Sequence, residues 1–266
     1  MQLSKHHGLA NDFLVVLDEV NGRALVVDAE LAVRLCDRHT GLGADGLIHG
    51  AAPAAGDDVD VVMRLFNADG SRAEMSGNGI RCLAQALATA RDVHEAVFRV
   101  GTDAGVRTVT VHESADHRGA MVSVEMGSAR PGPDVPGPLA EQLGGRFMTV
   151  DVGNPHLVLE VPDPDTVDLE TQGLWLEQQF PGGVNVEFVA PAGPDTIAVR
   201  VWERGVGPTR ACGTGACAAA HAAHAWGLVG ERVRVEMPGG AAEVQLGPSI
   251  TLIGPAQHVA TAEVPV

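Results

Sequence analysis

The feature that most constrains the fold of this chain is an internal repeat. A shift of 136 residues, from position 76 to position 212, places VVMRLFNADGSRAEMSGNG (61–79) on IAVRVWERGVGPTRACGTG (197–215) without a gap. The aligned pairs include Arg64 with Arg200, Phe66 with Trp202, and Ser76 with Cys212. Each copy predicts a strand, a glycine-rich loop and then a helix. An ungapped match through irregular loops favours two similar half-chains, so we predict an α/β (α+β) fold of two pseudo-symmetric domains.

The residues at the two helix starts indicate chemistry. Cys212 directly precedes Gly-Thr-Gly, and the helix dipole and free N–H groups there favour a thiolate over a thiol. The same N–H groups form a seat for a carboxylate. A pseudo-two-fold axis would bring both helix starts to one ligand, with Ser76 and Cys212 on opposite sides. Two proton-handling groups on opposite faces of one carbon are what a stereochemical inversion needs.

Composition restricts the alternatives. The chain has 266 residues, 45% hydrophobic and 20% charged, which is typical of a globular protein of one large or two ordinary domains. It contains no apolar run long enough to cross a bilayer, and its first residues lack a signal-peptide pattern, so we expect a soluble cytoplasmic protein. The four cysteines show no framework spacing and are predicted to be reduced; Cys36, Cys82 and Cys217 are predicted to pack in the core.

Charge excludes several partners. The formal net charge is −16, which argues against nucleic acid and anionic membranes as ligands. Lys5 is the only lysine, and its position near the N-terminus makes a pyridoxal-phosphate Schiff base an unattractive mechanism. The phosphate-binding glycine motifs lack their strand–helix context. His221 and His224 lie at a possible metal spacing but have no third ligand nearby. We therefore expect neither a metal nor a cofactor.

The hydrophobic pattern places the elements. Helices are predicted over 29–38, 80–91 and 169–179, with an Ala-rich helix that ends at Gly227. Residues 1–17 are predicted to be a loop, HHGLAND, that leads into an apolar strand, FLVVL. Residues 128–145, rich in Pro and Gly, are predicted to be a surface connection. Strands are predicted over 57–66, 97–100, 106–112, 121–126, 148–152, 156–161, 185–189, 195–202, 233–237, 242–246 and 249–254.

The motifs together resemble the diaminopimelate epimerase family. The resemblance covers nearly the whole chain and is carried, in order, by HGLANDF, HTGLGADGLI, FNADGS, EMSGNGIR, GNPH, NVEFV and ERGVGPTRACGTGACA. It implies an enzyme that needs no pyridoxal phosphate and interconverts LL- and meso-2,6-diaminopimelate by two-base proton transfer, for lysine and peptidoglycan precursor synthesis. It also implies two halves, each a sheet or barrel wrapped around a central helix, and a homodimer. The halves are 1–118, to which the C-terminal strand 258–266 returns, and 119–257.

The resemblance also assigns roles to residues. Cys212 matches the thiolate base, and Ser76 stands at the position of the second proton-transfer group. Gly213, Thr214, Gly77 and Asn78 match the N–H seat for the reacting carboxylate. Arg204 matches the partner of the distal carboxylate, with Asn67, Asn154 and Asn185 as companions and Asn11 lining the site. Glu203 matches a contact to the distal ammonium, and His156 and Glu203 match groups that tune proton transfer.

Two positions depart from the family pattern. Gly46 stands where some members have Gln, so any contact there is made by backbone. More important, the family motif is EMCGNG, and Ser76 replaces its cysteine. A helix dipole contributes only about 0.3–1 kcal/mol, too little to make the serine an alkoxide. Three explanations stay open: an inactivating Cys→Ser change that leaves substrate binding intact, a native Ser/Cys pair, or another amino-acid racemase or epimerase of the same fold.

Overall fold

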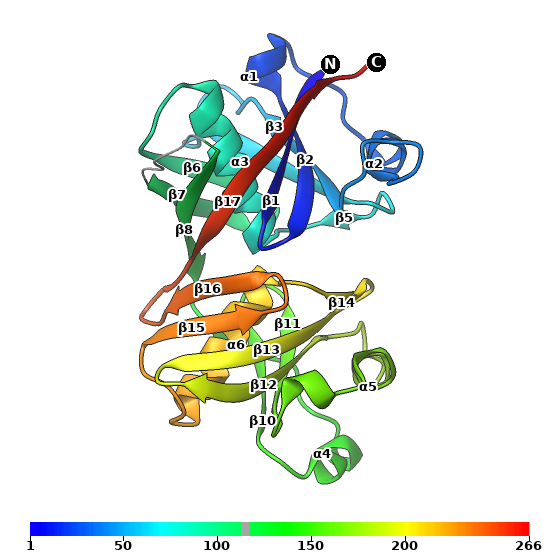
Figure 1. The fold of residues 1–266 in the computed structure, drawn as a ribbon, viewed down its shortest axis with the longest axis vertical. Helices are drawn as coiled ribbons and strands as arrows, with labels where there is room; N and C mark the ends of the chain where they lie inside the picture. The colour runs from blue at the N-terminus through cyan, green and yellow to red at the C-terminus, as the bar shows by residue number, and fades with distance from the viewer. Residues whose placement is uncertain (113–117, 266) are drawn as a thin grey trace. The chain divides into compact units, whose positions relative to one another are not determined.

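The computed structural model describes residues 1–112 and 118–265, and the chain divides into two compact units (Figure 1). Unit 1 comprises Met1–Glu125 and Gly254–Val266, and unit 2 comprises Met126–Ile253. The chain passes from one unit to the other within β8 (Gly119–Gly127) and returns within β17 (Ile250–Glu263). The halves expected from the sequence, 1–118 with 258–266 and 119–257, include residues 113–117 and Val266, which lie outside the described residues.

Unit 1 is a closed barrel of eight strands around one helix. The strands pair in the circular order β1, β2, β3, β4, β6, β7, β8, β17 and back to β1. The β2–β3 and β4–β6 pairs are parallel and the printed registers of the other pairs are antiparallel. The remaining bounds are β1 Gln2–Gly8, β2 Asn11–Leu17, β3 Gly46–Ala51, β4 Val61–Asn67, β5 Arg72–Ala73, β6 Ala96–Thr102, β7 Gly105–His112, α1 Asp18–Asn21, α2 Ala29–Cys36 and α3 Gly77–Ala90.

Unit 2 repeats this pattern around a second helix. β11–β12 and β13–β15 are parallel, and β10–β11, β12–β13, β15–β16 and β16–β17 are antiparallel. The elements are β9 Arg130–Pro131, α4 Gly137–Leu143, β10 Phe147–Asp151, β11 Pro155–Glu160, η1 Pro164–Thr166, α5 Leu169–Glu177, β12 Asn185–Gly193, β13 Thr196–Glu203, β14 Gly207–Thr209, α6 Gly213–Ala225, β15 Arg232–Met237 and β16 Gly240–Gln245. The predicted fold class, two pseudo-symmetric α/β halves each wrapped on a helix, is confirmed.

The two central helices are buried on nearly all sides, and their sequences explain why. α6 packs against β10, β11, β12, β13, β15 and β16, and its residues from Gly213 to Ala220 are all buried. Alanine allows the strands to approach the helix axis closely while keeping high helix propensity. Because α6 is surrounded by strands and is buried on nearly all sides, its apolar residues show no 3.6-residue stripe.

Two segments differ from the prediction. The loop expected before FLVVL contains β1, whose polar sequence QLSKHHG conceals its pairing with β2 and β17. The surface connection expected over 128–145 contains the short strand β9 and helix α4, which begins at a proline-rich turn. In both segments tertiary pairing supplies the stability that local composition does not indicate. None of the helices among the described residues is long and apolar enough to cross a membrane.

Candidate active site

Each central helix begins at a residue that caps it through its own side chain. In unit 1, Ser76 lies before α3 with φ −135° and ψ 124°, and its Oγ accepts a hydrogen bond from Gly79 N at 3.1 Å. In unit 2, Cys212 lies before α6 with φ −123° and ψ 121°, and its Sγ accepts from Gly215 N at 3.4 Å. The two N-caps have the same backbone geometry, so the sequence repeat corresponds to a structural repeat at these positions. We call them the serine mouth and the thiol mouth.

Asparagine side chains are fixed beside the serine mouth. The Asn78 Nδ2 amide donates to Asn11 Oδ1 at 3.1 Å, and Asn11 Nδ2 donates to Asp45 Oδ2 at 2.8 Å. Asn67, at the end of β4, pairs in register with Gly46 and donates through Nδ2 to Ser71 Oγ at 3.0 Å. The structure thus brings Asn11 and Asn78 into direct contact. Asn67 lies on β4, which is separated from β2, the strand of Asn11, by β3.

An ion-pair cluster that sequence reasoning missed holds the Asn11 loop. Arg38 bridges Asp12 and Asp45 at 2.7 Å each, and Lys5 Nζ lies 2.9 Å from Asp12. Burial alone would raise the pKa of Asp12, but the hydrogen bonds from Arg38 and Lys5 outweigh it and lower the pKa to about 2. The motifs HGLANDF and HTGLGADGLI, which contain Asp12 and Asp45, are therefore fastened to each other.

The serine mouth also contains a fully buried cation. Arg81 in α3 has no exposed surface, and its guanidinium donates to Gly77 O at 3.0 Å and to Asn78 Oδ1 at 2.8 Å. These bonds fix the first turn of the helix, including the Asn78 carboxamide. The cation lies on the helix that Ser76 caps.

The thiol mouth is surrounded by acidic groups. Burial, followed by the charges of Glu203 and Glu187, raises the pKa of Cys212 well above its usual value. The Thr214 hydroxyl, 3.4 Å from Sγ, and the Gly215 N–H act in the opposite direction. The Gly215 N–H thus acts in the direction expected for a helix start, but burial and the two carboxylates outweigh it. A helix terminus contributes less than the burial of a charge beside two carboxylates.

Glu203 lies at the end of β13, next to this thiol. Its Oε1 accepts from the Thr209 hydroxyl at 2.7 Å, which connects it to β14. Burial raises the pKa of Glu203, and the hydrogen bond from Thr209 opposes that effect. A carboxyl group whose pKa is raised can hold or release a proton more readily near neutral pH than an exposed one.

His156 and Glu187 form a buried pair on adjacent parallel strands. His156 Nδ1 lies 2.7 Å from Glu187 Oε1, and neither side chain has exposed surface. His156 Nε2 lies 2.8 Å from Asn154 Oδ1. Sequence reasoning identified His156 and Asn154 through the family motifs but missed Glu187. The available signal was a charged residue between Val186 and Phe188 in an otherwise apolar strand.

The remaining predicted residues of unit 2 also gather near the ends of β11, β12 and β13. Asn185 is buried; its Nδ2 donates to Pro155 O at 2.9 Å, and its Oδ1 accepts from Arg204 N at 3.0 Å. The Arg204 side chain is exposed and donates to Gly182 O at 3.4 Å. Within the part of the chain that the structure describes, Arg204 forms no salt bridge with a carboxylate, so its charge is available to a ligand.

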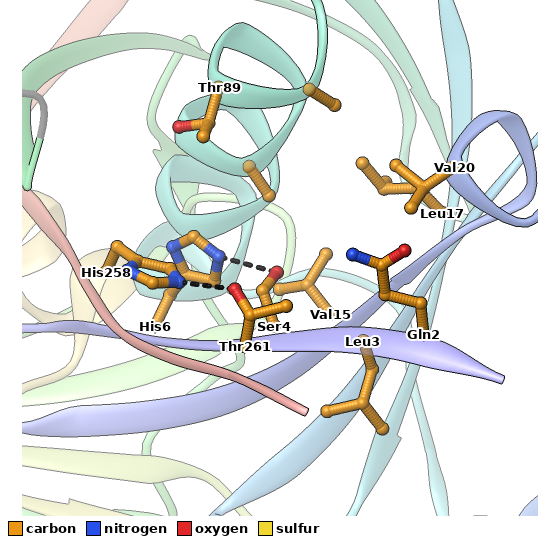
Figure 2. A pocket seen from close by; sticks show the side chains of 12 residues that line it. Gln2, Leu3, Ser4, His6, Val15, Leu17, Val20, Thr89, His258 and Thr261 are labelled. Atoms are coloured by element: carbon orange, nitrogen blue, oxygen red, sulfur yellow. Dashed lines mark hydrogen bonds between the residues drawn. The ribbon is translucent and has the colours of Figure 1, made fainter. Parts of the chain in front are cut away.

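The cavity of about 120 Å³ found in unit 1 is a different feature. It is lined by Ala86, Thr89 and Ala90 from the C-terminal part of α3, whereas Ser76 lies at the N-terminus of that helix. Figure 2 shows His6 and His258 at this cavity. His6 is hydrogen-bonded to Ser4, and His258 is hydrogen-bonded to Thr261. Burial lowers the pKa of His6 to about 4. Because the cavity lies away from the serine mouth, we do not assign it to the candidate active site.

Three other cysteines are structural. Cys36, Cys82 and Cys217 are buried, which confirms the prediction of core packing, and burial raises the pKa of Cys36 and Cys82 to about 12. Among the described residues, no group of three or more His, Cys, Asp and Glu side chains is arranged to hold a metal ion.

The fold of the two units, each with strands around a central helix, is also found in solved structures. A solved "Predicted Epimerase" from Pseudomonas aeruginosa matches with a TM-score of 0.76 at 19% identity, over 100% of this chain and 99% of that one. A hydroxyproline epimerase from Agrobacterium vitis matches with a TM-score of 0.70 at 18% identity, over 98% and 91% of the two chains. At these identities the likeness establishes the fold.

Sequence comparison gives the family. The family model described as "Diaminopimelate epimerase" matches residues 3–131 and 148–259. A diaminopimelate epimerase of Corynebacterium glutamicum is 43% identical over 275 residues, covering 98% of this chain and 97% of the relative. One from a Cyanothece species is 41% identical over 282 residues, covering 97% and 98%. The chain belongs to the diaminopimelate epimerase family.

Proposed function

We propose that the protein interconverts LL- and meso-2,6-diaminopimelate by moving one proton at an α-carbon, without a cofactor. The observation that carries the proposal is the pair of equivalent helix mouths, each with a proton-handling side chain at its N-cap. The names of its full-length relatives supply the substrate. The only lysine, Lys5, is paired with Asp12 and donates to Gly43 O at 2.6 Å, so it is not free to form a Schiff base.

In this proposal Cys212 is the base, and the substrate itself helps to ionise it. The carboxylates of Glu203 and Glu187 disfavour a thiolate in the empty site. A substrate ammonium beside these carboxylates would offset their charge and lower the pKa of Cys212. We place Glu203 at the reacting end of the substrate, because it lies beside Cys212. His156 would stabilise the negative charge that the thiolate and Glu203 share.

The serine mouth would deliver the proton on the opposite face. A neutral hydroxyl can donate a proton to a carbanion-like centre, although it is a poor base. The alkoxide would take a proton from water as it forms, and Cys212 would release the proton that it accepted to water before the next turnover. The N–H groups of Gly77, Asn78, Gly213 and Thr214 would hold the reacting carboxylate, where charge accumulates when the α-proton leaves.

Arg204 would bind the other amino-acid head of the substrate. Arg204 is exposed and free of intramolecular carboxylates among the described residues, so it suits the distal carboxylate. Asn185 orients the Arg204 backbone at 3.0 Å. Asn154, Asn67 and Asn11 would add amide contacts. Such a head-group site favours a substrate with two amino-acid ends over a simple amino acid.

The wider context follows from the same family resemblance. We place the enzyme in the cytoplasm, as a homodimer, in the synthesis of lysine and of peptidoglycan precursors. Its partner is a small zwitterionic molecule, and the net charge of −16 disfavours nucleic acid and anionic membranes.

The direct test is an incubation with LL-diaminopimelate in heavy water. We expect deuterium at the α-carbon together with formation of the meso isomer, both measured by mass spectrometry and chiral chromatography. L-Lysine, which lacks the distal carboxylate, is the matched control and should exchange far more slowly. Exchange of proline or lysine at a comparable rate would indicate a different racemase of this fold. Binding of diaminopimelate with no exchange would mean that Ser76 blocks turnover, and no binding would overturn the proposal.

A further inference from the structure

Glu187 lies within the motif NVEFV, but the resemblance assigns no role to its buried carboxylate. It lies in β12 with no exposed surface, and only its Oε1 has a partner, His156 Nδ1 at 2.7 Å. Among the residues that the structure describes, Glu187 Oε2 has no hydrogen-bond partner. A buried, half-satisfied carboxylate is costly, so its presence calls for a functional reason.

Glu187 lies directly under the first turn of α6. A Cβ atom added at Gly215 would be 2.6 Å from Glu187 Oε1 and 3.3 Å from Cys212 Sγ. The carboxylate and the thiol therefore border the same small space, and a side chain at position 215 would force the Glu187 carboxylate to shift. This proximity explains why the charge of Glu187 contributes to the raised pKa of Cys212.

The internal repeat shows what occupies this place at the serine mouth. Glu187 pairs with Val201 on β13, and the equivalent position on β3, paired with Leu65, is Ile48. A Cβ atom added at Gly79 would meet Ile48 Cδ1 at 3.1 Å, as the one at Gly215 meets Glu187. In the same way, His156 pairs with Asn185 on β12, and its counterpart Phe13 pairs with Gly46 on β3.

The fold therefore accepts an apolar pair at these two positions. Phe13 and Ile48 are both buried, and they support the serine mouth without any polar group. Replacing a buried ionic pair by apolar residues of similar size is often neutral or stabilising. The His156–Glu187 pair is thus not required to hold a strand pair under a helix mouth, and its specific place is beside the thiol.

The hydrogen bonds of His156 indicate what the pair does. Nε2 lies 2.8 Å from Asn154 Oδ1, and a carboxamide oxygen only accepts, so Nε2 carries the hydrogen. The other ring nitrogen, Nδ1, faces Glu187 Oε1 at 2.7 Å. With Oδ1 occupied by His156, the Asn154 carboxamide presents its NH₂ group away from the histidine, as a donor.

We propose that Glu187 is a positioning residue for the thiol mouth: it fixes the protonated Nε2 form of His156 and thereby holds the Asn154 carboxamide with its NH₂ group toward the substrate. The proposal rests on the proposed function for the identity of that substrate. In unit 1 the counterpart Asn11 is held differently, by Asp45 and Asn78, so no histidine is needed there.

The test combines three variants with two readouts. Glu187→Ile removes the carboxylate, His156→Phe with Glu187→Ile installs the apolar pair of the serine mouth, and Glu187→Gln keeps the volume and one hydrogen bond. We expect kcat/KM for diaminopimelate to fall about 10²-fold in the first two and about 10-fold in Glu187→Gln. The double variant should unfold at the same urea concentration as the wild type or higher, which keeps the test valid if Glu187→Ile folds poorly.

A purely structural role would give a different result. Because Glu187 is inferred to act through Asn154, adding Asn154→Ala to Glu187→Ile should cost less than a further twofold in kcat/KM. If the combined loss in kcat/KM equals the product of the losses in Glu187→Ile and Asn154→Ala, the proposal is overturned. Wild-type activity in the His156→Phe, Glu187→Ile variant would also overturn it. Glu236→Ile, an exposed position on β15, is the matched control and should leave kcat/KM unchanged.

The second readout needs no turnover. Nitrogen-15 NMR of the ligand-free protein should show a hydrogen on His156 Nε2 in the wild type, and a mixture of ring forms in Glu187→Ile. A wild-type His156 with its hydrogen on Nδ1 alone would overturn the proposal. A wild-type protein that has the Nε2 hydrogen but does not act on diaminopimelate would overturn the proposed function, while supporting the positioning of Asn154.

Discussion

The serine mouth and the thiol mouth share a backbone and differ in their electrostatics. The N-cap angles agree within about 12°, as φ −135° and ψ 124° at Ser76 and φ −123° and ψ 121° at Cys212 show, and each side chain accepts from the N–H three residues later. Beneath the serine lie Ile48 and the buried cation Arg81, whereas beneath the thiol lie Glu187 and Glu203. The repeat therefore preserves the anion-binding helix start and varies the groups that control proton affinity.

This difference assigns the two halves different tasks. Burial and the carboxylates beside Cys212 raise its pKa, so we expect its ionisation to depend on a cationic ligand. Arg81 at the other mouth favours negative charge, which suits the binding of a carboxylate. Substitutions that exchange or equalise the two mouths test this interpretation.

Making both mouths serine should have the largest effect. Cys212→Ser removes the only proton-handling group that is proposed to form a base, and we expect deuterium exchange to fall by about 10³-fold or more. The oxygen is a better cap than sulfur, so stability to urea should be unchanged or slightly higher. An exchange rate within tenfold of the wild type would contradict the assignment of Cys212 as base.

Making both mouths thiol is the converse experiment. Ser76→Cys should raise the epimerisation rate by about 10²-fold, because a thiol is a far stronger acid than a hydroxyl and reprotonates a carbanion faster. Ser76→Ala, which keeps the helix but has no proton to donate, is the matched control and should be slower than the wild type. If Ser76→Cys is unchanged or slower, the serine is native to the chemistry and the two mouths are tuned as a Ser/Cys pair.

Neutralising one carboxylate at the thiol mouth should have an intermediate effect. The charge of Glu203 contributes to the raised pKa of Cys212, so Glu203→Gln should lower that pKa. Alkylation of Cys212, followed by mass spectrometry across pH, should then reach half its maximal rate at a lower pH than in the wild type. Glu170→Gln, an exposed position on α5, should leave the profile in place. A shift to higher pH would contradict the electrostatic contrast between the mouths.

How much of this was predictable from sequence depends on whether the signal is local. The helix starts at Gly77 and Gly213 and the cap positions Ser76 and Cys212 were predictable, because GxG motifs and helix formers are adjacent in the chain. The direction of the shift in the Cys212 pKa was not predictable. It depends on burial and on two carboxylates that approach the thiol only in the folded chain. Strand β1 was missed for the same reason: its polar residues are stabilised by pairing with β17, more than 240 residues later.

The hairpins that carry Asn11 and Asn154 allow a smaller and separate test of the comparison. In unit 2 the turn before Asn154 contains Gly153 at φ 106°, whereas in unit 1 the turn before Asn11 places Leu9 at φ 56° and Ala10 at φ 63°. A left-handed conformation costs a non-glycine residue about 1–2 kcal/mol. Glycine avoids this cost, but its greater chain entropy in the unfolded state offsets part of the gain in stability. Ala10→Gly should therefore stabilise the protein to urea by about 0.5–1 kcal/mol.

The strained turn is fastened by Asp12 and Asp45, and strain at such a place is a means of holding Asn11 in one orientation. Relieving it should loosen that hold, so KM for diaminopimelate should rise a few-fold as stability increases, while Ala54→Gly, in an exposed loop, should not raise stability. A gain in stability with an unchanged KM would show that the Arg38 cluster alone positions Asn11.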